Sequence, residues 1–261
     1  MGFPETVALA AFAGGTIFLG LPVGRIRGLT PQWQAALTTA AGGVILFLIY
    51  DVLSQAVAPV EAALDAARAG ESAGQFAVYA AALAGSVAVG LLSVTWLTAR
   101  MSQRRHSVPL LPPSQVALGT ALGLGLHNFS EGLAIGQSAA TGATTLALVL
   151  VIGFALHNAT EGFAIAAPLA TGEPPTWRFL GLAGAVGGGP TFLGGVLGYA
   201  VVSPLLSIVF LGLAAGALIF VFNEMMSAAR RFAVPMVAGT ALMIGLVAAF
   251  ATDFVLVAAG A

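Results

Sequence analysis

Eight long apolar stretches follow one another along this chain of 261 residues, and they constrain its fold more than any other feature. A helix needs about 20 apolar residues to cross a bilayer. The stretches therefore predict eight transmembrane helices, over residues 5–24, 34–56, 76–99, 114–138, 142–167, 179–201, 204–228 and 235–258. Only 7% of the residues are charged, whereas soluble domains carry about 25%. We expect a single all-α integral membrane domain over residues 1–261.

The arginines predict which way the chain crosses the membrane. They follow the odd-numbered spans, at Arg25, Arg27, Arg100, Arg104, Arg105, Arg178, Arg230 and Arg231. Only Arg68 lies on the other side, in an acidic segment between the second and third spans. The positive-inside rule then places both termini outside and the loop at 100–113 in the cytoplasm. We expect a multi-pass protein of the inner (plasma) membrane. Glu5 precedes the first span and arginines follow it, the reverse of a cleaved signal, so this span should be retained.

Two similar decapeptides, HNFSEGLAIG and HNATEGFAIA, lie inside the fourth and fifth spans. Each places a His, an Asn and a Glu at positions i, i+1 and i+4, so the imidazole and the carboxylate share one helix face. A charge at the bilayer centre costs roughly 2.5–3.5 kcal/mol on insertion scales, and such residues usually mark ion pathways. The bland alternative is a duplicated helix with glutamates in bundle contacts. The candidate metal ligands are His127, Asn128, Glu131, His157, Asn158 and Glu161.

The chain has no cysteine, so these ligands offer only nitrogen and oxygen. Such a donor set suits Zn²⁺, Fe²⁺, Mn²⁺, Co²⁺ or Cd²⁺ and is poorly matched to Cu⁺. The two motifs are offset by thirty residues, with a turn near Thr141-Gly142, which predicts an antiparallel hairpin. The motifs then run in opposite directions, as in inverted repeats that form a site near the midplane.

The doubled motif resembles that of the ZIP (Zrt/Irt-like protein) family of divalent metal transporters. The resemblance extends over the eight spans, and it implies a ZIP-like bundle in which the six motif residues bind the transported metal, at a site that can hold two ions. It also implies an elevator-like or rocking movement of the helices that carry the site. The chain departs from the family at Thr160, where a helix-kinking Pro is usual, and at Gly189 before Pro190, where a Glu is usual. We therefore expect one tightly held ion, and a second position that a carboxylate at residue 189 would restore.

Three further acids lie within the predicted spans. By the predicted topology Asp51 and Asp253 lie toward the outer face and Glu224 toward the inner face, so they would form an entrance and an exit for cations. The alternative is that they lie near the membrane surface and contact water. The triplet Gly187–Gly189 and the many small-xxx-small spacings predict close helix packing, because no lysine follows them as in a phosphate loop.

Together these features predict a transporter that moves Zn²⁺, or Fe²⁺, Mn²⁺, Cd²⁺ or Co²⁺, into the cytoplasm. The metal is expected as the transported substrate, with no cofactor. The expected partners are metal ions and lipid, without nucleic acid, and a homodimer is a further option. The main alternative is an intramembrane metal-dependent enzyme, although no HExxH motif is present. A metal-sensing or structural membrane protein is the third alternative.

Overall fold

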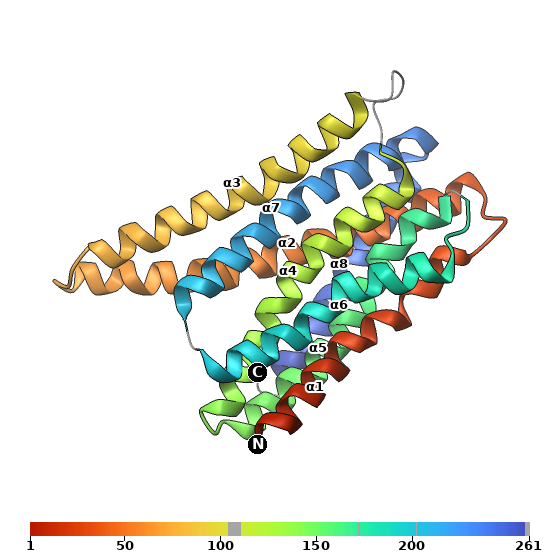
Figure 1. Cartoon of the computed structure of the whole chain (residues 1–261). Coiled ribbons are helices and arrows are strands. Elements are labelled where there is room, and N and C mark those ends of the chain that lie inside the picture. The colour runs from red at the N-terminus through yellow and green to blue at the C-terminus, as the bar shows by residue number, and fades with distance from the viewer. Residues whose placement is uncertain (104–110, 172, 202, 259–261) are drawn as a thin grey trace.

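The computed structural model describes residues 1–103, 111–171, 173–201 and 203–258, and in these ranges it contains helices and no strand. The main elements lie side by side in a bundle (Figure 1). They are α1 (Phe3–Gly15), α2 (Pro31–Arg68), α3 (Gly74–Gln103), α4 (Pro113–Ala140), α5 (Thr144–Ala166), α6 (Trp177–Ala200), α7 (Pro204–Ala229) and α8 (Pro235–Ala258). Short 3-10 helices are η1 (Thr16–Leu19), η2 (Leu21–Arg25), η3 (Ala167–Thr171) and η4 (Arg230–Phe232). The predicted all-α fold is confirmed.

Seven helical segments within the described residues are long and apolar enough to cross a membrane, so this is a multi-pass membrane protein. The exception among the long helices is α4, which has 28 residues but is too polar to meet that criterion. It packs against α1, α5, α6 and α7 in the interior of the bundle (Figure 1), and sixteen of its residues are buried. The polar side chains of α4 are therefore shielded by protein, and its role as an eighth span remains a prediction.

Prolines mark the starts of several helices. Pro31, Pro113 and Pro204 each occupy the first position of a helix, where the missing N–H is not needed. The Thr30 hydroxyl caps α2 by accepting from the Trp33 N–H (3.5 Å), and the Ser203 hydroxyl does the same for α7. These prolines thus coincide with helix starts.

The helix bounds differ from two of the predicted spans, whose limits in the membrane remain predictions. The helix α2 continues to Arg68, although we expected the span to end at residue 56. The extension is rich in Ala, a strong helix former, and Arg68 pairs with Asp65 at 3.2 Å, so polarity did not end the helix there. The first span is a helix only to Gly15 and then continues as η1 and η2, where Gly20 lies against the backbone of α5.

Glycines divide the bundle into two groups of helices. Several glycines lie so close to a neighbouring helix that a Cβ added to them would clash with its backbone. Glycines of this kind join α1, α4, α5 and α6, which are here called the motif group. Others join α2 to α8 and α3 to α7, and these four helices are here called the flanking group. Between the groups, α4 faces α7 through side chains. A Cβ on Gly119 would lie 3.6 Å from Val221 Cγ2, and one on Gly123 would lie 3.2 Å from Leu218 Cδ2. Backbones thus approach closely within the motif group and within the pairs α2–α8 and α3–α7, whereas α4 meets α7 through side chains.

Candidate metal site

The two motifs meet because α4 and α5 form a tight antiparallel hairpin. The turn between Ala140 and Thr144 contains Gly142 at φ +82°, a conformation that favours glycine. Each helix brings its own His and Glu together, as their spacing predicts. The distance from Nε2 to Oε1 is 3.4 Å for His127–Glu131 and 3.7 Å for His157–Glu161.

Contacts between the helices join the two halves into one cluster. His127 Nε2 lies 3.8 Å from Glu161 Oε1, and the ring centroids of His127 and His157 are 6.0 Å apart. All six motif residues are buried. The structure therefore brings the predicted ligands together in the interior of the protein.

Hydrogen bonds fix the orientation of both motif asparagines. Asn128 Nδ2 donates to Glu161 Oε2 (2.7 Å) and to the Gly187 carbonyl (3.0 Å), and Asn158 Nδ2 donates to the Ala13 carbonyl (3.1 Å). A carbonyl cannot donate, so the nitrogen of each amide must face these acceptors. Each Asn therefore presents its Oδ1 atom on the other side.

The site contains an unusual concentration of polar atoms without hydrogen-bond partners. Among the described residues, these buried atoms are both ring nitrogens of His127, His157 Nε2, Asn128 Oδ1, Asn158 Oδ1, Glu131 Oε2 and Glu161 Oε1. More than nine in ten buried polar groups normally have a partner, because leaving one unpaired costs about 1–3 kcal/mol. Imidazole nitrogens and carboxylate or amide oxygens are ligands for divalent transition metals. The arrangement is chemically suited to binding such a cation.

Asp51 also belongs to this site. One carboxylate oxygen of Asp51, on α2, lies with nitrogens of His127 and His157 in a set of atoms all within 4.8 Å of one another. The sequence suggested a separate position toward the outer face, because Asp51 belongs to no motif. The only signal for it was a charged residue inside an apolar stretch. The structure thus adds a carboxylate from the flanking group to ligands from the motif group.

The other two predicted pathway acids do not join the cluster in the same way. Asp253, on α8, is half-buried and lies three residues after Phe250, whose ring packs on Phe47 of α2 with centroids 4.8 Å apart. This pairing places Asp253 near the level of Asp51. Glu224, on α7, instead lines a mostly apolar cavity of about 110 Å³ between α3, α4 and α7. The structure does not align the three acids along one path.

The expectation for Gly189 was wrong. Gly189 is exposed, and a Cβ added there would meet no atom within 4 Å, so a side chain would point out of the bundle. The glycine of α6 that contacts the site is instead Gly187, whose carbonyl oxygen accepts a hydrogen bond from Asn128. The prediction placed residue 189 in the site because Pro190 follows it, but residue 189 lies on another face of α6. A carboxylate there would not reach the candidate metal ligands. Thr160 is the other position where the sequence differs from the ZIP pattern. There α5 continues as a helix, and the Thr160 hydroxyl donates a hydrogen bond to the His157 carbonyl at 2.7 Å.

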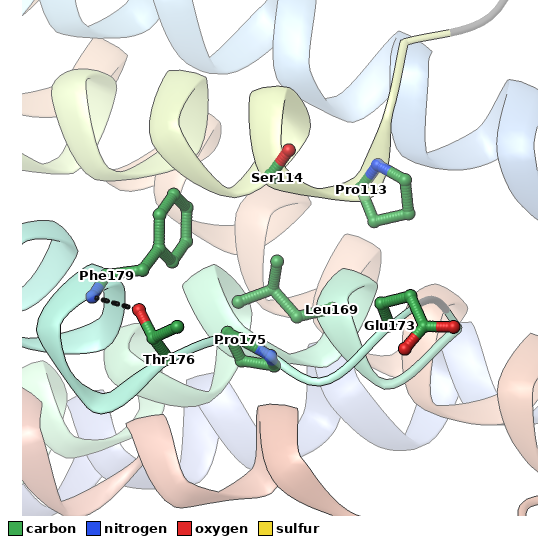
Figure 2. Close-up of a pocket in the computed structure, with 7 residues that line it drawn as sticks. All are labelled: Pro113, Ser114, Leu169, Glu173, Pro175, Thr176 and Phe179. Carbon is green, nitrogen blue, oxygen red and sulfur yellow. Dashed lines mark hydrogen bonds between the residues drawn. The ribbon is translucent and has the colours of Figure 1, made fainter.

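Two cavities flank the start of α4 at the end of the bundle that carries most of the arginines, here called the arginine-rich end. One, of about 400 Å³, lies between the starts of α4 and α6 and is drawn in Figure 2. Its wall includes Leu169 and Phe179, and the Phe179 N–H donates to the Thr176 hydroxyl at 3.1 Å. The other, of about 390 Å³, lies between the two helix groups. Arg104, Arg105 and His106 of the predicted cytoplasmic loop lie outside the described residues.

A scan against protein-family models gives no match, and no curated protein matches the sequence. The chemistry of the site therefore rests on its own residues and geometry.

Proposed function

We propose that this protein transports divalent transition-metal ions across the membrane and that the six motif residues, with Asp51, form its transport site. The observation that carries the proposal is the set of unpartnered nitrogen and oxygen atoms, contributed by two histidines, two asparagines and two glutamates in the protein interior. Such atoms are costly to bury unless a ligand satisfies them. A cation that passes through the site would supply that partner.

The donor set favours Zn²⁺ and chemically similar ions. Two imidazoles suit a borderline metal, and Glu131 and Glu161 supply negative charge that offsets a dication removed from water. Mg²⁺ prefers oxygen ligands and retains its water, and Cu⁺ prefers sulfur. We expect Zn²⁺ to be the preferred substrate, with Fe²⁺, Mn²⁺, Co²⁺ and Cd²⁺ as competitors.

The membrane arrangement in this proposal is that of a ZIP-like transporter. The polar helix α4 would be an eighth span, and both termini would face the exterior of an inner membrane. The arginine-rich end would face the cytoplasm, following the positive-inside rule. Metal would move toward that end, driven by its own gradient or by the membrane potential.

The two helix groups offer a mechanism for alternating access. Close backbone contacts at glycines would keep the motif group together as one body while it shifts against the flanking group. The side-chain contacts at Gly119 and Gly123 would permit such a shift more readily than interlocked backbones. Asp51 would act across this boundary, contributing its carboxylate in one arrangement and withdrawing it in the other.

Uptake by liposomes that contain only this protein tests the proposal. Zn²⁺ should accumulate inside, detected by a trapped fluorescent chelator, and Cd²⁺ and Mn²⁺ should compete while Mg²⁺ should not. Glu131→Gln and Glu161→Gln keep side-chain volume but remove a charged ligand, so uptake should fall at least about tenfold. Glu224→Gln is the matched control because Glu224 lies away from the motif residues.

No Zn²⁺ uptake above that of empty liposomes, or full uptake by Glu161→Gln, would refute the proposal. An intramembrane metalloenzyme, the alternative, would bind metal at the same residues without moving it across the bilayer. Binding without uptake would therefore favour the enzyme.

A further inference from the structure

The cavity between the two helix groups has a chemistry unlike that of the metal site. It begins about 16 Å from His127 along α4, since Val116 on its wall is eleven residues away at 1.5 Å per residue. Both groups contribute to its wall, which includes Thr38, Val116, Thr171, Met225 and Arg231. Among the described residues that line it, Arg231 carries the only charge. A cavity on the predicted route of a dication is thus basic.

Two further features add positive potential or hydrogen-bond donors to this cavity. Pro113, the first residue of α4, lines it, so the positive end of the dipole of a 28-residue helix lies at its wall. Thr38 is 2% exposed, and its hydroxyl has no hydrogen-bond partner among the described residues. An acceptor placed in the cavity would satisfy this hydroxyl, which is otherwise costly to bury. Arginine, a helix N-terminus and a free hydroxyl together are the groups that bind an oxyanion.

A neighbouring cavity provides a natural comparison. It is lined by Thr39 and Arg230, the residues next in sequence to Thr38 and Arg231. There the Thr39 hydroxyl already donates to the Ala35 carbonyl (2.9 Å), and Arg230 donates to the Ser227 hydroxyl (2.9 Å). Of these two cavities, as far as their described residues show, the one between the groups combines an arginine with a buried hydroxyl that has no hydrogen-bond partner.

We propose that the cavity between the groups binds a small multivalent oxyanion of the phosphate class, entering from the arginine-rich end. The Arg231 guanidinium would hold two of its oxygens and the Thr38 hydroxyl would donate to a third. A volume of about 390 Å³ has room for such an anion and several waters. Thr38 and Arg231 lie on the side of the flanking group and the start of α4 belongs to the motif group, so an anion held by all three would bridge the groups and hold them in one arrangement. The expected consequence of anion binding is slower metal transport. That consequence rests on the proposed function, whereas the binding itself does not.

Calorimetric titration of the purified full chain with inorganic phosphate tests the binding, without transition metal and against chloride at equal ionic strength. Arg231→Gln should weaken phosphate binding at least about tenfold, because a charge-assisted bidentate contact is lost. Thr38→Val, nearly equal in volume, should weaken it about threefold to tenfold. Arg230→Gln and Thr39→Val are the matched controls and should bind phosphate as the wild type does. Thermal unfolding of each variant checks that it is folded.

Absence of phosphate binding by the wild type would overturn the proposal, as would equal losses in Arg230→Gln and Arg231→Gln. Nanodiscs with and without phosphatidylglycerol distinguish the source of the phosphate group. If the anionic lipid occupies the site and free phosphate does not, the soluble ligand is excluded. Phosphate binding by a chain that takes up no Zn²⁺ would refute only the transport function, and uptake without phosphate binding would refute only this inference.

Discussion

The contact between α4 and α6 allows a quantitative prediction from a single methyl group. A Cβ on Gly136 would lie 2.5 Å from both the Gly195 carbonyl oxygen and the Tyr199 nitrogen, and backbone atoms cannot rotate away. Since ordinary contacts begin near 3.4 Å, Gly136→Ala would force the helices apart by about 0.9 Å. Overpacking of this kind costs typically 1–3 kcal/mol.

Gly119→Ala is the matched control on the same helix. A Cβ there would lie 3.6 Å from Val221 Cγ2, an ordinary contact, and both substitutions change helix propensity equally. Unfolding in mixed detergent micelles should therefore show Gly136→Ala less stable than Gly119→Ala by about 1–3 kcal/mol. Gly136→Ala should also bind Zn²⁺ more weakly, because separating the helices lengthens the bond from Asn128 to Gly187. Equal stability of the two variants would refute the close packing.

Three further predictions concern orientation, amide chemistry and stoichiometry. Tags at Met1 and Ala261 should be accessible in intact cells and a cysteine at Ser107 protected, and reversed labelling would overturn the topology. Asn128→Asp should destabilise the metal-free protein by about 1–3 kcal/mol, because a carboxylate replaces the donor 2.7 Å from Glu161. Thermal unfolding without metal tests this, and an unchanged midpoint would contradict it. Metal analysis of purified protein should give one ion per chain, and two fully occupied central ions would contradict the single-ion prediction.

The sequence predicted the site residues that belong to the repeated motif, but it did not predict that Asp51 lies beside them. The i and i+4 spacing of His127 and Glu131 defines one helix face, and its repetition thirty residues later identified the partner face. Asp51 belongs to no repeat, so its approach to the histidines depends on how α2 packs against the motif group. That packing is a tertiary property, which one helix cannot predict.

Helix ends and helix faces were predicted less well than the helices themselves. Apolarity marks the part of α2 that can cross a membrane, but helix formation continues through its polar, Ala-rich end to Arg68. The prediction that residue 189 faces the site failed for a related reason. In α6 glycines occur on several faces, so composition could not show which of them points inward.

The polarity of α4 has a consequence for how the protein is made. During synthesis α4 emerges after α1, α2 and α3, yet it packs most extensively against α6, which is made two helices later. Because α4 is less apolar than the seven segments that meet the criterion for crossing a membrane, it would enter lipid less readily as an independent segment. The nascent chain would have to retain α4 beside α1, or at the translocon itself, until α5 and α6 arrive. The polar motif residues of α4 would thereby make membrane insertion of this chain a cooperative event.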